Sequence, residues 1–333
     1  MSKSKKHHYV PQLHLKHFAN AKTSRGKKNY SVYFYDKKDD IKGKVNIKKA
    51  AMENYFHGKG ESGQIIEDTM GRFETKVAPV YRDLISYKDH QILENIKSRV
   101  IISAFITIQH IRTLKSREEI RSTFKMAKEE LFEQFDDDRS REVIEKYYPE
   151  EEVEEVHLSL INQKVLSDLT KILYDKKWIL LENNTDFPFW TSDNPVARYN
   201  PLDLSPYGNL GVASWGIQIY FPLNTKLCLC LLDPERYRTY NNLEKVKFKD
   251  INQNIKNAEK SIIEDIDEIE FINGLQIIES YRQIFSKFDN FSLAKKMIKE
   301  NPNMKNLENE IEVNFQKEFR PGSGLIHTRN IRK

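Results

Sequence analysis

The chain has 333 residues, a net charge of +5 and a mean hydropathy of -0.68. This length allows one large domain or two small ones with a substantial core. Since no segment approaches the roughly 20 uncharged apolar residues of a membrane span, and the first residues lack the apolar stretch of a signal peptide, we expect a cytoplasmic protein with no membrane partner. Cys228 and Cys230 alternate in a strand-like run, which predicts buried thiols rather than a disulfide or zinc site.

The charges are distributed unevenly along the chain. Residues 1–49 contain 14 Lys or Arg and 3 Asp or Glu, whereas residues 129–155 contain 3 Lys or Arg and 13 Asp or Glu. A basic segment beside histidines suits a polyanion such as nucleic acid. A solvated, lysine-rich surface would explain the same composition.

The N-terminal run 7–18 concentrates histidines, aromatics and a proline. Pro11 favours an extended conformation at Val10, and it can itself start a short helix over 12–18. The aromatic and β-branched segment 31–36 predicts a hairpin with 44–47, joined by a charged turn.

The middle of the chain is predicted to be helical over 61–86, 92–114, 117–150 and 153–175. On the first helix, Glu67 and Glu74 line a stripe about a quarter turn from the apolar face. On the second, Gln109 and Arg112 lie one turn apart, where a guanidinium could bind a carboxylate or a phosphate. Ordinary boundary charge, with Arg112 paired to Glu67 or Glu74, is the structural alternative.

From residue 177 the pattern changes to short apolar runs bounded by turn residues, which predict an antiparallel sheet. The expected strands are 178–181, 187–191, 217–221 and 227–232, followed by a helix over 250–272. The predicted fold class is α+β, with a helical layer packed on a mostly antiparallel sheet and the N-terminal motif threaded between them. We expect one domain over 7–272, divided into an N-terminal motif and hairpin (7–60), a helical part (61–175) and a sheet part (176–272). A charged extension over 273–333 would follow, loosely attached beyond about Ser292.

Three motifs resemble the bacterial family DUF4238: HHYVPQ at 7–12 with the following L..F, TSDNPV at 191–196, and FPL at 221–223. The likeness covers about 7–258 and includes the segments around Glu67, Glu74, Gln109 and Arg112. Leu114 stands where the family usually has a proline. His14 and His17 stand where the family usually has an aromatic and a polar residue, so they are not carried over as site residues. The resemblance implies an association with defence against phage but no established chemistry.

Four residues make a mixed histidine and carboxylate set suited to Mg²⁺ or Mn²⁺, and less so to Zn²⁺: His8, Glu67, Glu74 and Asp193. Such a site could activate water for phosphodiester hydrolysis. We predict His8, Glu67 and Asp193 as catalytic residues, with His8 acting as base or ligand. Gln109, Arg112 and Asn194 are the predicted substrate-binding residues, with Arg112 as the phosphate clamp.

These residues leave two classes of function open. The first is a metal-dependent nuclease or phosphodiesterase effector in phage defence, which predicts that His8, Glu67, Arg112 and Asp193 meet in one cleft. The second is a non-catalytic recognition module that binds nucleic acid or a phage component as its trigger. In that reading His8 braces the SDNP turn, and the polar residues satisfy one another.

Overall fold

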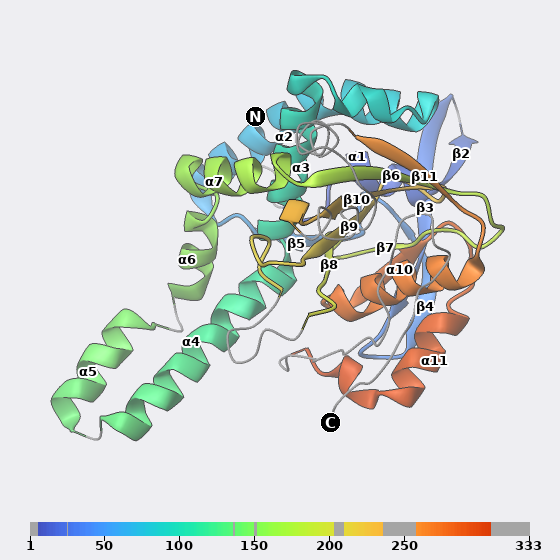
Figure 1. Ribbon diagram of the computed structural model, residues 1–333. Helices are drawn as coiled ribbons and strands as arrows, with labels where there is room; N and C mark the ends of the chain where they lie inside the picture. The colour runs from blue at the N-terminus through green and yellow to red at the C-terminus, as the bar shows by residue number, and fades with distance from the viewer. Residues whose placement is uncertain are drawn as a thin grey trace.

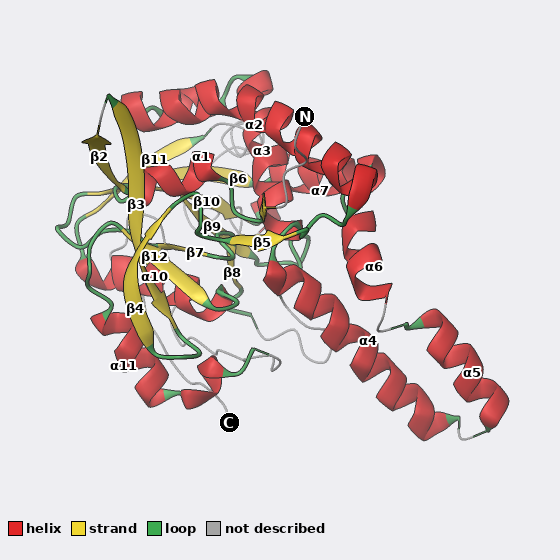
Figure 2. Ribbon diagram, turned by 180° about the vertical axis from the view of Figure 1, so that it is seen from behind, coloured by secondary structure: helices red, strands yellow, loops and turns green. Residues whose placement is uncertain are grey.

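The computed structural model describes residues 6–24, 26–135, 137–149, 152–202, 210–235 and 258–307. The α+β prediction is confirmed: helices cover a mostly antiparallel sheet, and a second sheet lies beside it (Figures 1 and 2). No helix in these ranges is long and apolar enough to cross a membrane.

The helical part is divided more finely than predicted. Its elements are α1 (Gln12–Leu15), η1 (Lys16–Phe18), α2 (Gly60–Tyr87), η2 (His90–Leu93), α3 (Ile96–Ile111), α4 (Leu114–Gln134), α5 (Asp138–Tyr147), α6 (Val153–Ser159) and α7 (Gln163–Tyr174). The predicted helix over 117–150 is two helices, and the one over 153–175 is also two. Side-chain caps explain these breaks, because Asp137 accepts from the Ser140 N–H and Asn162 accepts from the Val165 N–H.

The central sheet contains three of the predicted strands, those at 178–181, 217–221 and 227–232, whereas the predicted strand over 187–191 is not among its members. Its members are β6 (Lys177–Asn183), β8 (Ala197–Tyr199), β9 (Gln218–Pro222), β10 (Leu227–Leu232) and β11 (Glu259–Ile263), in the order β11-β6-β10-β9-β8. All pairs are antiparallel except β11 with β6. Leu229 packs in one core cluster with residues of α2, α3 and α7, whereas Cys228 and Cys230 pack in a second cluster with residues of α10 (Ile266–Glu279). Both thiols are free and buried, as predicted.

The second sheet joins distant parts of the chain. It contains β2 (Asn20–Ser24), β3 (Lys27–Asp36), β4 (Ile41–Asn46), β7 (Thr191–Ser192) and β12 (Gln283–Ser286). The β3–β4 pair is the predicted hairpin, and β12 lies between β3 and β7. A separate pair, β1 (Lys6–His8) with β5 (Met52–Asn54), holds the first histidines.

The C-terminal prediction is wrong in two respects. Residues 259–263 form a strand instead of a helix, and α10 runs from Ile266 to Glu279, so the expected domain boundary at 272 falls inside this helix. Residues 250–257 lie outside the described residues. Beyond α10, β12 and α11 (Ser292–Glu300) are part of the fold, because Ile298 and Met304 are buried against Trp190 and Phe291. The expected loose attachment beyond Ser292 therefore fails for 292–307.

Two helices project from the body. Figures 1 and 2 show α5 and the outer part of α4 extending away from both sheets as a helical pair. We call residues 122–135 and 137–147 the arm. Its two helices are held together by the ion pair between Lys128 Nζ and Glu145 Oε2 at 2.6 Å and by packing of Arg141 over the Phe132 ring.

Candidate functional site: a histidine and carboxylate cluster around Arg112

Asp193 is held by the backbone of the segment between α10 and β12. Its Oδ1 accepts from the Tyr281 N–H at 2.8 Å, and its Oδ2 accepts from those of Arg282 and Gln283, both at 2.7 Å. The residue is buried, and burial raises the pKa of the carboxyl to about 6 although the three amides and Lys37 favour its charged form. Both oxygens are engaged by backbone amides, which suits a structural anchor, and the ligand and catalytic role of Asp193 stays a prediction.

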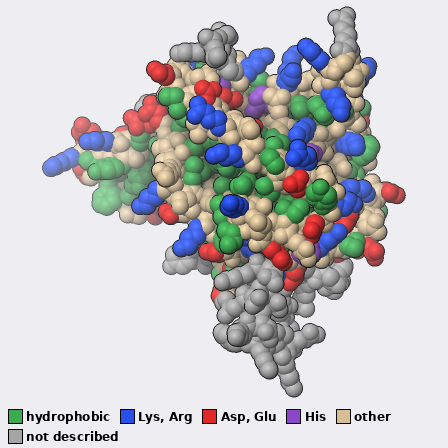
Figure 3. All heavy atoms as spheres, turned by 90° about the horizontal axis from the view of Figure 1, so that it is seen from above, with side chains coloured by type: hydrophobic (Ala, Val, Ile, Leu, Met, Phe, Trp, Pro, Cys, Tyr) green, Lys and Arg blue, Asp and Glu red, His purple; other side chains and the backbone are tan. Residues whose placement is uncertain are grey.

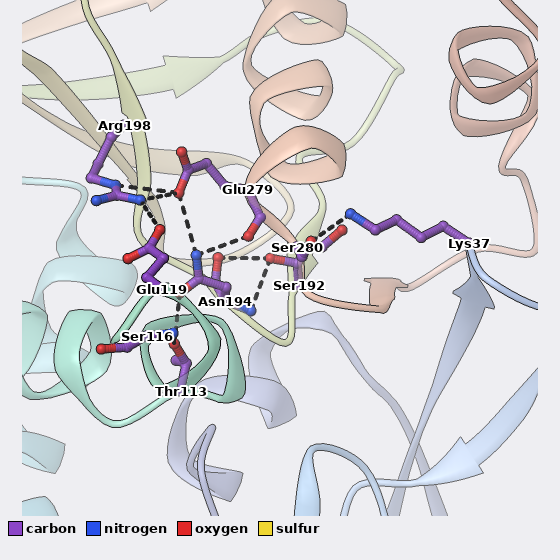
Figure 4. A network of polar contacts seen from close by, with 9 residues as sticks. All are labelled: Lys37, Thr113, Ser116, Glu119, Ser192, Asn194, Arg198, Glu279 and Ser280. Atoms are coloured by element: carbon purple, nitrogen blue, oxygen red, sulfur yellow. Dashed lines mark hydrogen bonds and ion pairs between the residues drawn. The ribbon is translucent and has the colours of Figure 1, made fainter. Parts of the chain in front are cut away.

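Asn194 is likewise engaged within the protein (Figure 4). Its Nδ2 donates to the Glu279 carbonyl at 2.9 Å, and its Oδ1 accepts from the Thr113 hydroxyl at 3.0 Å. Nearby, Arg198 bridges Glu119 at 2.6 Å and Glu279 at 3.0 Å. The turn thus ties β8, α4 and α10 together, and the structure does not present Asn194 as the predicted substrate contact.

His14 is the N-terminal histidine that reaches the turn. Its Nε2 lies 2.8 Å from Thr191 Oγ1, and its Nδ1 lies 2.8 Å from the Tyr81 hydroxyl, which donates to the Leu223 carbonyl at 2.9 Å. Since that donation uses the tyrosine proton, His14 Nδ1 is the donor to Tyr81 and Nε2 accepts from Thr191. Burial lowers the pKa of His14 to about 3, so it is neutral. His14 was not among the site residues predicted from the sequence. The signal that could have identified it was its position one turn after Pro11, next to Leu15 and Phe18, which are buried.

Arg112 is the centre of a second polar group. Its guanidinium is 1% exposed and contacts Glu74, with 3.1 Å between Nη2 and Oε1. With its carboxamide oxygen turned towards Arg112, Gln109 accepts from Nε at 3.1 Å and from Nη2 at 3.0 Å. Arg112 leaves the α3 helix as its C-cap, which directs the guanidinium to α2. Arg112 therefore pairs with a carboxylate of α2, as the structural alternative to phosphate binding expected.

Glu67 and His57 form a close pair beside Arg112. The distance from His57 Nε2 to Glu67 Oε2 is 3.4 Å, with an orientation outside that of a hydrogen bond. Burial raises the pKa of Glu67 to about 7, with Glu74 repelling the charged form and Arg112 opposing the shift. Burial, followed by Arg112, lowers the pKa of His57 to about 3. At neutral pH the pair therefore consists of a neutral imidazole and a carboxyl group close to half-protonation.

His57 was not identified from the sequence, because it lies in the loop between β5 and α2 where no periodicity marks a face. Its backbone N–H donates to His7 Nδ1 at 3.1 Å, and the two rings stack with centroids 5.4 Å apart. His57 is 1% exposed, yet neither ring nitrogen has a hydrogen-bond partner. Buried polar side chains without a hydrogen-bond partner are rare in folded proteins, so His57 is a candidate functional residue.

His8 belongs to the Arg112 group. Burial lowers the pKa of His8, with Arg112 as the next cause, while the carbonyl groups of Ile47 and Lys48 favour its protonated form. Its buried Nε2 has no hydrogen-bond partner. Within the described residues, no hydrogen bond or ion pair joins His8 to Asp193. The predicted residues thus separate into one group around Arg112, with His8, Glu67, Glu74 and Gln109, and another at the turn, with Asp193 and Asn194.

The predicted divalent-metal set does not fit a preformed site. Asp193 uses both carboxylate oxygens on backbone amides. In the part of the chain that the structure describes, no group of three or more His, Cys, Asp or Glu side chains is placed to hold a metal ion. We therefore derive no chemical step through a metal.

A groove of about 640 Å³ lies away from this cluster, between α3 and α7. Val100, Leu166 and Tyr174 are among its lining residues, and none of the predicted site residues lines it.

Comparison with known proteins gives one match. A family described as "Protein of unknown function (DUF4238)" matches residues 6–290. No curated protein and no solved structure matches the chain. The matched range includes the Arg112 cluster, the SDNP turn and β12.

Proposed function

The chain belongs to the DUF4238 family, and from this premise and the geometry of the Arg112 cluster we propose that it is a hydrolase of nucleic-acid phosphodiester bonds that serves in bacterial defence against phage. The observation that carries the chemistry is the Glu67–His57 pair. A carboxyl group with a pKa of about 7 lies 3.4 Å from a buried, neutral imidazole. The defence role rests on the resemblance alone.

Glu67 suits general acid–base catalysis because its pKa lies near the pH of the cell. A group with such a pKa accepts and releases a proton with little cost, and positioned acid–base groups contribute about 10²- to 10⁴-fold in rate. The side chain of Glu67 is 26% exposed, so solvent and a substrate can reach it. In this proposal Glu67 takes a proton from a water molecule as the water oxygen bonds to phosphorus, and it returns the proton to the oxygen that leaves as the P–O bond breaks. The neutral ring of His57 lies beside the carboxyl group.

Arg112 supplies the group that would bind the phosphate. A guanidinium matches two phosphate oxygens, and its charge favours the extra negative charge of the transition state. In the structure Glu74 occupies this position, with a side chain that is also 26% exposed. A substrate phosphate would have to replace the Glu74 carboxylate at Arg112.

The test is cleavage of plasmid DNA, single-stranded DNA and RNA by the purified protein, with Mn²⁺ and with EDTA. We expect cleavage of at least one substrate, reduced about 100-fold or more by Glu67→Gln, which keeps the shape but cannot act as a base. Asp68→Asn is the matched control, since Asp68 is the exposed neighbour on the same helix. Divalent-metal binding remains a prediction, and activity found only with Mn²⁺ would support it over the metal-free chemistry. No cleavage under any condition refutes the enzyme.

The competing function is a non-catalytic recognition module for nucleic acid or a phage component. One observation favours it: Arg112 and Asp193 already have partners within the protein, as that reading predicts. Binding of labelled oligonucleotides without turnover, unaffected by Glu67→Gln, would support recognition over hydrolysis.

A further inference from the structure

A glycine lies between the two acidic residues of the Arg112 cluster. Gly71 follows Glu67 by one turn of α2 and precedes Glu74 by nearly one turn, so the three residues share one side of the helix. Gly71 is exposed, and a Cβ atom placed on it would meet no side chain of another element within 4 Å. We call this free space between the Glu67 and Glu74 side chains the opening.

The fold gives no reason for a glycine at this position. Gly71 lies inside α2 without a positive φ, and no neighbouring element lies close enough to exclude a side chain. Glycine inside a helix is less favourable than alanine, because it loses more conformational freedom on folding. The space that Gly71 leaves free is therefore a candidate entrance to the cluster.

A buried polar side chain beside Glu67 lacks hydrogen-bond partners. His57 is 1% exposed, neither of its ring nitrogens is hydrogen-bonded, and its Nε2 lies 3.4 Å from Glu67 Oε2. A neutral imidazole has one N–H donor and one acceptor. Because a buried donor without a partner is unfavourable, His57 indicates a ligand with oxygen atoms at this place.

Glu74 occupies the position that a phosphate would take. Its Oε1 lies 3.1 Å from Arg112 Nη2, and within the described residues it is the only carboxylate in an ion pair with this guanidinium. Arg112 is 1% exposed, whereas the Glu74 side chain is 26% exposed. The carboxylate therefore has room to turn into solvent, while the guanidinium is fixed. A phosphate offers the guanidinium a similar pair of oxygens and keeps a negative charge beside Glu67.

The burial of Arg112 also restricts the kind of nucleic acid. Double-stranded DNA is stiff over about 150 base pairs, so its phosphates stay on the outside of a rod. A phosphate reaches a buried guanidinium only on a strand that bends into the opening, as a single strand can. In Figure 1 α2 lies along the top of the molecule, and Figure 3, seen from above, shows Lys and Arg side chains spread over that face, which attract a polyanion.

We propose that the Arg112 cluster binds a phosphate of a single-stranded nucleic acid, which enters at the opening and displaces Glu74 from Arg112. The phosphate then pairs with the guanidinium and accepts a hydrogen bond from His57. Without a strand, Glu74 keeps Arg112 paired and the site closed. This inference rests on the proposed function, because it uses Arg112 as the phosphate site of the hydrolase.

The experiment measures binding of labelled single-stranded DNA and RNA oligonucleotides by fluorescence anisotropy. It is done in EDTA and in a Glu67→Gln background, which cannot act as a base. We expect at least one strand to bind, at least about tenfold more tightly than its duplex. Glu74→Gln should tighten binding about fivefold, because it removes the carboxylate that competes for Arg112. Glu61→Gln, at an exposed position of the same helix, is the charge-matched control and should change the affinity less than about twofold.

A second variant fills the opening. Gly71→Leu places a better helix former at an exposed position, so the protein should be at least as stable in urea unfolding and yet bind the single strand at least about tenfold more weakly. Thr69→Leu adds a similar side chain at an exposed position on the opposite side of α2, and it should leave binding unchanged.

Four outcomes overturn the proposal: a duplex bound as tightly as the single strand, an unchanged affinity in Glu74→Gln, an unchanged affinity in Gly71→Leu, or no binding of any strand. They are distinct from failure of the hydrolase. Strand binding with the expected changes but without cleavage by the wild-type protein would support the site and refute the enzyme. Cleavage with unchanged binding in both variants would support the enzyme and refute this site.

Discussion

Replacing Asp193 distinguishes an anchor from a catalyst. Asp193→Ala leaves three backbone N–H groups, those of residues 281–283, without their acceptor. A buried donor left unsatisfied costs about 1–3 kcal/mol. Because these three residues are only partly buried and water can reach them, we take the low end for each and expect a loss of about 3 kcal/mol. That is a large part of the ~5–15 kcal/mol by which a domain is stable.

Asp193→Asn should lose less, about 2 kcal/mol. Its single oxygen can replace Oδ2 and keep two of the three hydrogen bonds, while its NH₂ group faces the Tyr281 N–H. The assay is urea unfolding followed by tryptophan fluorescence and circular dichroism, which report the free energy of unfolding. The control is Asp186→Ala, an exposed residue of the loop before β7, for which we expect a change within about 0.5 kcal/mol. An Asp193→Ala protein as stable as wild type but inactive would refute the anchor and restore the catalytic role.

Three further perturbations test the interior. Lowering the pH from 7 to 5 should reduce the free energy of unfolding, by about 4 kcal/mol from five of the buried groups. His14, His57 and His157 have pKa values lowered to about 3, 3 and 4, so their stabilisation is present above pH 6.5 and is lost below it at ~2 kcal/mol each, whereas the raised pKa values of Asp193 and the partly exposed Glu67 act in the opposite sense by ~1 kcal/mol each. The lowered pKa values of His17 and His110, about 4 each, add to the loss, and the raised pKa of Glu268, about 7, opposes it. Unfolding curves that coincide at the two pH values would contradict this. His14→Phe keeps the ring but leaves the Thr191 hydroxyl without its acceptor, for a loss of ~1–3 kcal/mol in the same assay, and an unchanged midpoint would count against the assigned hydrogen bonds. Met304→Ala should cost ~2–5 kcal/mol if residues after 292 are part of the core, whereas a neutral effect would show that they are not.

The sequence was informative where periodicity decides structure. The apolar spacing of α2 predicted a helix over 61–86, close to Gly60–Tyr87, and the same helical geometry placed Glu67 and Glu74 on a common stripe that meets Arg112. The breaks at Asp137 and Asn162 were missed, because a capping side chain interrupts a helix without changing its apolar spacing.

Other features depend on tertiary structure. Residues 259–263 become a strand because they pair in parallel with β6, which lies about 80 positions earlier. The local sequence of a segment does not reveal such a distant pairing. Nor does an aspartate in a turn show that the amides of residues 281–283 will take its oxygens. His57 joins Glu67 only through a loop conformation, so its role could be found only from coordinates.

The position of β12 has a consequence for how the chain acquires its shape. Ile284 lies between Tyr35 and Ser192, so the second sheet unites segments separated by about 250 and 90 positions. A ribosome delivers Tyr35 long before Ile284, and until then β3 and the two-residue β7 each lack a neighbour along one edge. Closure of that sheet is thus a late event, slowed by the entropy of joining distant segments. During synthesis the β3–β4 hairpin therefore has an unpaired edge until β12 is made. Unpaired strand edges are prone to aggregation unless another part of the chain or another protein covers them.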